Sequence, residues 1–179
     1  MAKVKDQVVY ALQLMAQRND VIQDTHGNVS GRDGDRFMWI KPSGLPYNQI
    51  KEPDICGIDI NPPAKDWIQD VGDLKPSVDT PHHAQIYRTN PHVRAICHTH
   101  SPHVVAHAIR TEDIKCLCTE QADYFGGDVK CLWYRGLDDW GYDIHVHPGQ
   151  KAVLLGSHGA LTFADDPVQA VKLAIALEN

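Results

Sequence analysis

Apolar residues recur at helical spacing at both ends of the chain. Near the N-terminus they stand at Val4, Val8, Ala11, Leu12 and Met15. Apolar side chains three and four positions apart share one face of a helix, so an amphipathic helix ending near residues 18–20 is predicted. The last fifteen residues, DDPVQAVKLAIALEN, predict a second helix, with Asp165 or Asp166 near its cap and Pro167 in its first turn.

Between these helices, short apolar runs are bounded by turn-forming residues and predict strands. The predicted strands are RFMWIK (36–41), DICGIDI (54–60), RAICHTH (94–100), IKCLCTE (114–120) and KAVLLGSHG (151–159). Residues 25–35 predict a loop and a turn, because Asn28 and the segment from Gly31 to Gly34 carry turn chemistry. Residues 60–77 contain two adjacent prolines and predict a loop with room for a short hairpin.

Two more helices are predicted in the middle of the chain, at DTPHHAQIYRTN (79–90) and SPHVVAHAIR (101–110). Each has a hydroxyl residue that can cap it and a proline that suits its first turn. Strands and helices mixed in this way favour an α/β fold of α/β/α layers. No repeat, low-complexity tract or long linker divides the chain, so residues 1–179 are expected to form a single domain.

Charge and composition narrow the classes of function. The 179 residues carry a formal net charge of −6, and no Lys/Arg cluster offers a stripe for phosphate backbones, so no nucleic-acid partner is expected. The N-terminus has no apolar run that could be a signal or a membrane span, so we expect a cytoplasmic protein without membrane contact. Its five cysteines are expected to be reduced, with Cys116 and Cys118 in the core.

The sequence RAICHTHSPHVVAHAIR places four histidines within ten positions. Residues two apart on a strand point to the same face, so His98 and His100 would present two imidazoles together. Taken alone, an H-x-H pair is more often incidental. A third candidate, His158 in LLGSHGAL, follows an apolar strand and precedes a turn glycine. Three imidazoles with an open position are typical of a catalytic zinc site, although spacing does not show that His158 meets the pair.

The remaining histidines give weaker signals. His103 and His107 are four positions apart on the predicted helix, among valines and alanines, which favours packing or supporting roles over metal binding. His145 and His147 form another H-x-H pair, but the proline and glycine that follow indicate a strand ending at the surface. No third ligand accompanies that pair, so we do not expect a metal there.

Several motifs together resemble a known family. GNVSGR, KPSG, PSVDTPHHAQIYRTNP, ICHTHS, ADYFGG and LLGSHGAL occur in the order found in the class II aldolase/L-ribulose-5-phosphate 4-epimerase family, across about residues 4–178. The resemblance implies a zinc-dependent sugar-phosphate enzyme, built on an α/β/α fold with a central, largely antiparallel sheet. It also implies a cyclic homotetramer with active sites between subunits. His98, His100 and His158 match the three zinc-binding histidines of the family.

The resemblance also implies a phosphate site. Asn28, Ser43 and Gly44 match positions that hold the substrate phosphate, and Lys41 matches a lysine near the substrate. Backbone N–H groups and hydroxyls around a glycine suit phosphate oxygens, and a lysine supplies a point charge. Without the family, KPSG and GNVSG would be interpreted as plain β-turns. Ser77 matches the first of a pair of serines, whereas Val78 replaces the second and removes one side-chain donor.

Two acids distinguish the branches of the family. Aldolases usually carry Glu at the position of Asp79, as the acid/base beside zinc, whereas the Asp in SVDTP and Asp123 in ADYF resemble the epimerases more closely. The implied reaction is retro-aldol cleavage between the third and fourth sugar carbons, with zinc stabilising the enediolate, followed by re-addition of the rotated aldehyde. Asp123 would serve as an acid/base at the hydroxyl of the fourth carbon. Without the family, Asp79 would be interpreted as a helix cap and Asp123 as a turn residue.

The resemblance therefore favours a zinc-dependent L-ribulose-5-phosphate 4-epimerase-like enzyme acting on a pentulose 5-phosphate. Family epimerases continue beyond the last helix into a segment that carries a tyrosine for the second proton transfer, and the domain 1–179 is expected to lack that C-terminal extension. The alternatives are a fuculose-1-phosphate aldolase-like enzyme or a decarboxylase, which needs only zinc and one acid/base. A further alternative is a homologue of reduced catalytic function that has a binding role.

Overall fold

The computed structural model describes residues 3–22, 24–62, 67–133 and 144–179, which form a mixed sheet of eight strands. In spatial order these are β4 (Ile68–Val71), β3 (Cys56–Asp59), β2 (Phe37–Ile40), β1 (Asn28–Asp33), β5 (Ala95–Thr99), β8 (Gly159–Ala164), β7 (Ala152–Leu155) and β6 (Cys131–Leu132). Neighbouring strands pair antiparallel except for β6 and β7, which are parallel. The expected largely antiparallel sheet is confirmed.

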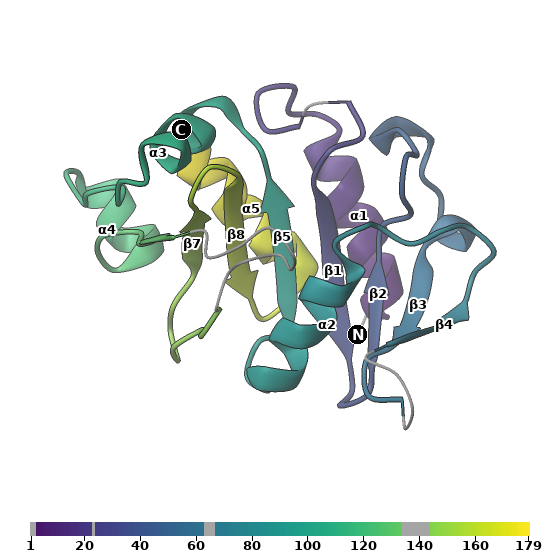
Figure 1. Cartoon of the computed structure of the whole chain (residues 1–179). Coiled ribbons are helices and arrows are strands. Elements are labelled where there is room, and N and C mark those ends of the chain that lie inside the picture. Colours follow the sequence, from purple (N-terminus) through teal and green to yellow (C-terminus); the bar gives the residue numbers. More distant parts are fainter. Residues whose placement is uncertain (1–2, 23, 63–66, 134–143) are drawn as a thin grey trace.

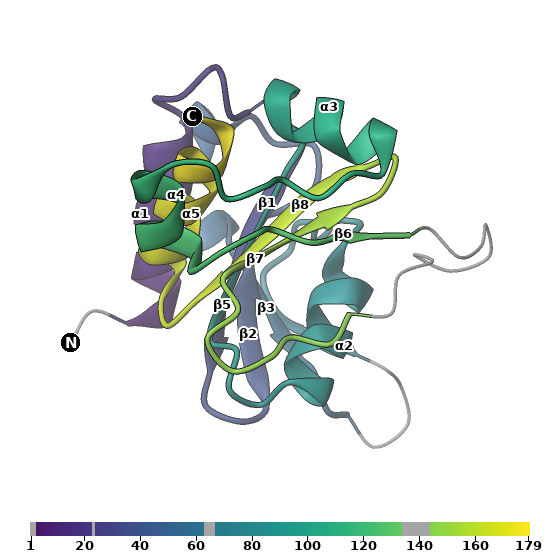
Figure 2. The ribbon, with the colours of Figure 1, turned by 90° about the vertical axis from the view of Figure 1, so that its left-hand side faces the viewer.

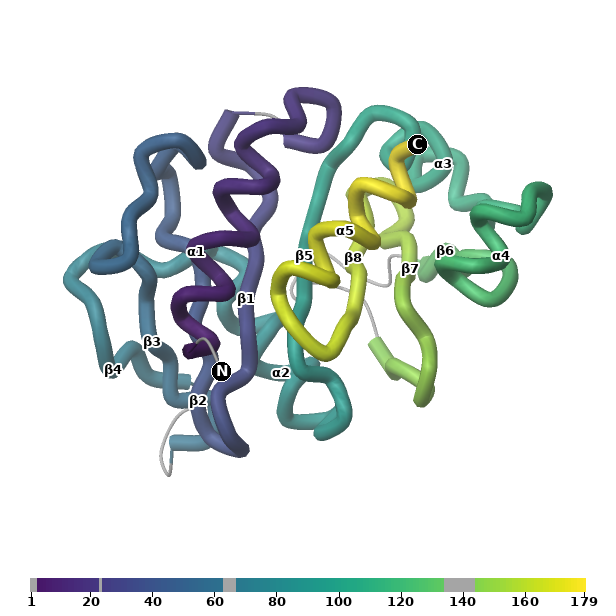
Figure 3. Tube along the Cα trace, turned by 180° about the vertical axis from the view of Figure 1, so that it is seen from behind, coloured from purple at the N-terminus to yellow at the C-terminus, as the bar shows by residue number. Residues whose placement is uncertain are grey.

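Helices cover both faces of the sheet (Figures 1 and 2). α1 (Val4–Met15) and α5 (Pro167–Glu178) lie side by side on one face, as Figure 3 shows from behind, and α4 (Thr119–Phe125) lies beyond them on that same side. α2 (Thr80–Thr89) covers the other face, and α3 (Pro102–Arg110) follows directly from the end of β5. Single 3₁₀ turns occupy Tyr47–Gln49 and Glu52–Asp54. The arrangement is the predicted α/β/α layering.

Alternation along β5 separates the core from the candidate site. Ala95 and Cys97 pack into the cluster beneath α1 and α5, whereas Ile96 packs into the cluster beneath α2. Because strand side chains alternate between faces, His98 lies on the same face as Ile96, toward α2. Val8, Leu12 and Met15 of α1 and the buried alanines of α5 seal the opposite face. One strand thus contributes to both cores and presents polar groups only at its end.

Residues 28–33 are a strand rather than the predicted loop and turn. β1 pairs with β2 on one side and β5 on the other, and five of its six residues are buried, so tertiary pairing overrides the local turn preference. Gly31 is required by packing, because a Cβ there would lie 2.6 Å from Cγ1 of Val4 on α1. The turn glycines lie just outside the strand, at Gly27 and Gly34, where φ is +74° and +64°.

The predicted strand at residues 114–120 is wrong. Only Ile114 forms a bridge, to Val129, and the chain then turns into α4 at Thr119. The carboxylate of Asp128 accepts the backbone N–H of Cys116 at 2.9 Å, which replaces a ladder hydrogen bond. Cys118 is exposed and Cys116 only half-buried, so neither belongs to the core as expected.

The end of the first helix and the content of one predicted loop also differ from the predictions. The first helix ends at Met15, and the residues up to 22 form turns. The predicted loop at 60–77, with room for a short hairpin, contains β4, a largely exposed edge strand that pairs antiparallel with β3. At the C-terminus, α5 begins at Pro167 as predicted, and Oδ1 of Asp166 accepts the N–H of Gln169 at 2.9 Å. All five cysteines are free. Within the described residues, no helix combines the length and the apolar character needed to span a membrane.

Candidate metal centre

The structure brings three histidines of distant sequence position together. His98 lies on β5, His100 directly follows that strand, and His158 lies in the turn that joins β7 to β8. β5 and β8 are antiparallel neighbours, with Thr99 opposite Ala160, so the start of β8 lies beside the end of β5. One nitrogen from each of the three imidazoles falls within 4.8 Å of the others. Sheet topology supplies the convergence that sequence spacing could not show.

The ring of His98 is fixed by the backbone. Its Nδ1 lies 2.9 Å from the carbonyl oxygen of Ala160, and because a carbonyl only accepts hydrogen bonds, Nδ1 carries the proton. Nε2 is then the nitrogen with a lone pair for a metal. The ring stands nearly perpendicular to those of His100 and His158, with centroids 4.5 and 4.9 Å away, while those two rings stack.

Burial keeps these imidazoles neutral. Desolvation, aided by the neighbouring imidazoles, lowers the pKa of His98 and of His100 to about 3. Desolvation also lowers the pKa of His158, and the carboxylate of Asp79 opposes that shift. Neutral imidazoles are the form that binds a metal ion. Three of them in a half-buried cluster fit a borderline cation such as zinc better than magnesium or calcium, which prefer oxygen ligands.

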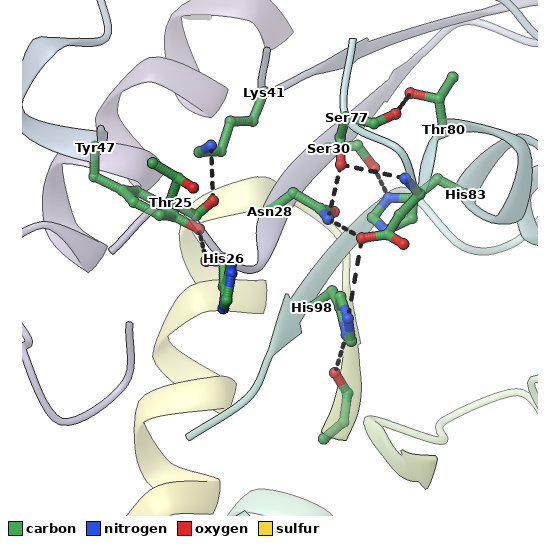
Figure 4. A network of polar contacts seen from close by, with 12 residues as sticks. Thr25, His26, Asn28, Ser30, Lys41, Tyr47, Ser77, Thr80, His83 and His98 are labelled. Carbon is green, nitrogen blue, oxygen red and sulfur yellow. Dashed lines mark hydrogen bonds and ion pairs between the residues drawn. The ribbon is translucent and has the colours of Figure 1, made fainter. Parts of the chain in front are cut away.

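Asp79 lies beside this cluster at the N-terminus of α2. Its Oδ2 is 4.0 Å from Nε2 of His98 and accepts a hydrogen bond of 2.6 Å from Nδ2 of Asn28. Asn28 also donates to Oγ of Ser77 at 3.1 Å, as the network in Figure 4 shows. The carboxylate is half-buried and makes no cap hydrogen bond to α2, although the sequence also allowed a plain helix cap. It is therefore directed to the histidines and to Asn28.

The segments that carry the candidate phosphate ligands pair with each other. Pro42 and Pro76 form an antiparallel bridge, flanked by backbone hydrogen bonds from Ser43 to Lys75 and from Ser77 to Lys41. Ser43 and Gly44 are exposed in the turn after this bridge, and Gly44 has a φ of +70°. The turn chemistry predicted for KPSG is thus present.

Lys41 is buried behind this turn. Its Nζ donates to the carbonyl oxygens of Thr25 and Pro42, each at 3.1 Å, and lies 4.9 Å from the ring centroid of Tyr47. Desolvation lowers the pKa of Lys41 to about 8. Tyr47 in turn donates to the carbonyl oxygen of His26 at 3.0 Å (Figure 4). A buried lysine with this pKa is a charge that a bound anion would stabilise.

Comparison with known proteins gives the family. The model described as Class II Aldolase and Adducin N-terminal domain matches residues 6–179. The chain belongs to the class II aldolase/adducin family. Class II aldolases typically depend on a divalent metal, and the cluster of His98, His100 and His158 offers such an ion three nitrogen ligands.

Solved structures of the family resemble this one along nearly its whole length. An L-fuculose 1-phosphate aldolase is 26% identical, with a TM-score of 0.82 and coverage of 99% of this chain and 84% of its own. The L-fuculose 1-phosphate aldolase from Glaciozyma antarctica PI12 is 24% identical, with a TM-score of 0.75 and coverage of 98% and 69%. YgbL from Klebsiella pneumoniae, a putative aldolase/epimerase/decarboxylase, is 21% identical, with a TM-score of 0.76 and coverage of 98% and 84%.

One candidate residue of this member of the class II aldolase/adducin family lies elsewhere in the fold. Asp123 is exposed on α4, which packs on the side of the sheet that carries α1 and α5. His98 points to the opposite face, toward α2. Within one chain, the structure therefore does not bring Asp123 to the histidines.

Sequence reasoning missed two imidazoles beside the cluster. The ring of His26 meets that of His100 edge to face, with centroids 6.0 Å apart. His82 lies in the first turn of α2, where burial lowers its pKa to about 4 and its charge would interact with Asp79 and His158. His82 stands three positions after Asp79, a helical spacing that could have indicated it. His26 stands two positions before Asn28. Its place beside the cluster could be inferred only once Asn28 was known to begin β1.

The other histidines remain outside the cluster. His103 is largely exposed, and its Nδ1 lies 2.9 Å from Oε1 of the buried Glu178. The same carboxylate accepts the backbone N–H groups of His103 and Val104 at 3.0 and 3.2 Å, so Glu178 of α5 caps the start of α3. His107 is half-buried, and His145 and His147 are exposed on chain without regular structure.

Proposed function

We propose that this chain is a zinc-dependent aldolase that cleaves a ketose phosphate by retro-aldol chemistry. The observation that carries the proposal is the cluster of three neutral imidazoles, whose nitrogens lie within 4.8 Å of one another, beside the carboxylate of Asp79. The similarity to L-fuculose 1-phosphate aldolase, at 26% identity, supports the substrate class. Substrates of that type are ketose 1-phosphates.

His98, His100 and His158 would hold the metal ion. Zinc, when bound, would supply positive charge against the negative charge that develops on the ketose oxygens as the carbon–carbon bond breaks. We assign the proton transfer to Asp79, whose Oδ2 lies 4.0 Å from Nε2 of His98 and so beside the proposed metal ligands. The carboxylate takes the proton of the hydroxyl that becomes the aldehyde, while the carbon–carbon bond pair stays with the ketose fragment. Asp79 then returns that proton to the carbon of the ketose fragment that kept the bond pair.

The phosphate would bind at the paired turns. Ser43, Gly44 and Ser77 offer hydroxyl and backbone groups there, and Lys41 supplies charge from behind. Val78, which follows Ser77, is 68% exposed as a residue, and its side chain has no hydrogen-bond donor. The Ser77 hydroxyl is therefore the side-chain donor that this turn offers to a phosphate oxygen.

A second candidate is L-ribulose-5-phosphate 4-epimerase chemistry on a pentulose 5-phosphate. It is favoured by an Asp at position 79, where the family resemblance implies that aldolases usually carry Glu, and by Asp123 in ADYF. Because α4 lies on the face of the sheet opposite α2, and His98 points toward α2, Asp123 would have to act in the site of a neighbouring copy. This candidate therefore also requires the homotetramer with sites between subunits. In it, Asp123 exchanges the proton of the fourth-carbon hydroxyl while the aldehyde fragment rotates and re-adds.

A panel of sugar phosphates, followed by NMR with zinc-loaded protein, tests both candidates. The aldolase should release dihydroxyacetone phosphate from L-fuculose 1-phosphate. The epimerase should instead convert L-ribulose 5-phosphate to D-xylulose 5-phosphate. If stoichiometric zinc is bound and neither reaction occurs, both candidates fail, and a binding role for a family member of reduced catalytic function takes their place.

A further inference from the structure

We propose that Glu178 is a positioning residue for the metal centre: its buried carboxylate anchors the start of α3, the helix that connects the ligands His100 and His158. The inference rests on the proposed function, because the two imidazoles matter as ligands only if the cluster holds zinc. It adds to that function a residue outside the cluster that acts through the backbone.

The start of α3 is capped by another helix. Ser101 occupies the N-cap position, yet its side chain makes no cap hydrogen bond. The carboxylate of Glu178, in the last turn of α5, takes that role: Oε1 accepts the N–H of His103 at 3.0 Å and Oε2 accepts the N–H of Val104 at 3.2 Å. These are the second and third residues of the helix, whose N–H groups an N-cap side chain ordinarily accepts. The start of α3 is therefore held by α5.

Burial and charge strengthen this contact. Only 3% of the Glu178 side chain is exposed, so the carboxylate depends on protein groups for the hydrogen bonds that water would otherwise supply. Besides the two N–H groups, Nδ1 of His103 lies 2.9 Å from Oε1. A negative charge at a helix N-terminus interacts favourably with the helix dipole, and hydrogen bonds to a charged acceptor are roughly twice as strong as neutral ones. Leu177 and Val104 belong to one apolar cluster, which packs the same turn of α5 against α3.

His100 lies between two fixed points of the chain. Thr99, the residue before it, pairs with Ala160 in the ladder of β5 and β8. His103, three residues after it, is held by the carboxylate of Glu178. The backbone at His100 therefore keeps its position only while both contacts persist, and one of the two is the contact with Glu178.

The other end of α3 contacts the turn that carries His158. The carbonyl oxygen of Ala108, in the last turn of α3, accepts the N–H of Ser157 at 2.7 Å. Ser157 directly precedes His158 and has a φ of +63°, a conformation that a non-glycine residue keeps when its surroundings hold it there. A displacement of α3 would reach His100 through the start of the helix and His158 through its end. The rings of these two histidines stack with centroids 4.9 Å apart, so such a displacement would change the geometry offered to a metal ion.

Zinc affinity, measured on the full chain by competition with a chromophoric chelator, tests this role without turnover. Glu178→Gln keeps the shape of the side chain but turns an NH₂ group toward one of the two N–H groups, so that hydrogen bond is lost. Its zinc Kd should rise by about tenfold, the lower end of the effect of removing a group that supports a metal ligand. A zinc Kd equal to that of the wild type would overturn the inference.

Two controls separate positioning from a loss of stability. His103→Ala removes the imidazole contact but keeps the backbone N–H groups that Glu178 accepts. Val8→Ala lowers the stability of the fold from a buried position on α1, in a different apolar cluster from Val104. Both should keep the zinc Kd within about threefold of the wild-type value, because sites without shared partners act independently. If Val8→Ala raises the Kd as much as Glu178→Gln does, lowered stability explains the effect and the inference is wrong.

NMR of the full chain follows the two rings directly, whether or not zinc is bound. The imidazole signals of His100 and His158 should shift in Glu178→Gln and keep their wild-type positions in Val8→Ala; unshifted signals in Glu178→Gln would overturn the inference. Should Glu178→Gln fail to fold, Glu178→Asp takes its place, since its carboxylate is one methylene too short to reach both N–H groups. Absence of zinc from the wild type sinks the proposed function, and the ring signals then decide whether Glu178 positions the two histidines.

Discussion

The imidazole of His98 donates through Nδ1 to the carbonyl oxygen of Ala160, 2.9 Å away. Ala160 belongs to the β5–β8 ladder, where it lies opposite Thr99. The strand pairing that brings His158 to the end of β5 therefore also fixes which nitrogen of His98 faces the cluster. A carbonyl that orients an imidazole in this way is the usual support of a metal-binding histidine.

The first prediction concerns zinc itself. His98→Ala should abolish stoichiometric zinc binding, because two imidazoles remain where a catalytic zinc site needs three protein ligands. His147→Ala is the matched control, since His147 is exposed outside the cluster. Metal analysis after dialysis measures both. In the wild type, zinc at 100 times its Kd should stabilise the fold by about 2.7 kcal/mol, seen as a rise in Tm that His98→Ala lacks. Equal zinc content in the two variants would refute the assignment of ligands.

The second prediction concerns Lys41, whose pKa burial lowers to about 8. Above that pH the amine loses the charge that attracts an anion, so affinity for inorganic phosphate should fall as pH rises through about 8. Calorimetry from about pH 7.5 to 9.5 measures this, with Lys41→Met as the control of weak and pH-independent affinity. A wild-type affinity that stays level across this range would show that Lys41 does not contact the anion.

The lowered pKa of Lys41 also makes the free energy of unfolding depend on pH, and the direction of that dependence follows from the shift. The folded-state pKa of Lys41 lies below the ordinary value of 10.5, so between these two values the unfolded chain holds a proton that the folded chain has released. The contribution of Lys41 to the free energy of unfolding therefore rises with pH from about 8 to 10.5. The difference between the wild type and Lys41→Met in denaturant unfolding should show this rise.

The third prediction concerns the glycine after the third histidine. A Cβ on Gly159 would lie 2.3 Å from the carbonyl oxygen of Thr99 and 2.9 Å from Cδ2 of His100. Gly159→Ala should therefore push β8 from β5, lower the free energy of unfolding by about 1–3 kcal/mol and weaken zinc binding. Gly34→Ala is the control: its Cβ would meet nothing within 4 Å, so it should cost only the strain of its positive φ and keep zinc affinity. Equal zinc affinity in the two variants would count against this packing argument.

The fourth prediction separates the two acids. Asp79→Asn should lower the rate of carbon–carbon cleavage by about 100-fold or more while zinc stays bound, because the amide cannot exchange the proton. Asp123→Asn should leave cleavage intact and remove epimerisation only, if the epimerase candidate holds. NMR of both reactions with each variant measures this. Full cleavage activity in Asp79→Asn would remove that residue from the mechanism.

Sequence predicted the frame of the fold because its signals are local. The pattern of α1, the proline and acid at the start of α5, and the short apolar run of β5 each fix an element within its own residues. β1 was missed for the opposite reason: Asn28 and Gly31 have turn propensity, and only pairing with two neighbouring strands and the approach of Val4 explain a strand there. The prediction that Cys116 and Cys118 lie in the core was wrong for a similar reason, because residues 114–120 leave the sheet.

The candidate site likewise combines residues that the local sequence predicts with residues that only the tertiary structure brings together. His98 and His100 share a face by strand periodicity alone, whereas His158 joins them only through the β5–β8 pairing. The contact between Asn28 and Asp79 joins residues 51 positions apart and has no trace in local sequence. The family resemblance anticipated the three histidines and the layered fold, and its assignment of Asn28 to the phosphate stays a prediction. The hydrogen bonds of its amide were visible only in the structure.

The most direct test of the account is the release of dihydroxyacetone phosphate from L-fuculose 1-phosphate, measured side by side in zinc-loaded wild type, metal-stripped wild type and His98→Ala. The account predicts product from the zinc-loaded wild type, loss on stripping with recovery on added zinc, and none from His98→Ala. Equal release by wild type and His98→Ala would contradict the central claim that His98, His100 and His158 form a catalytic metal centre.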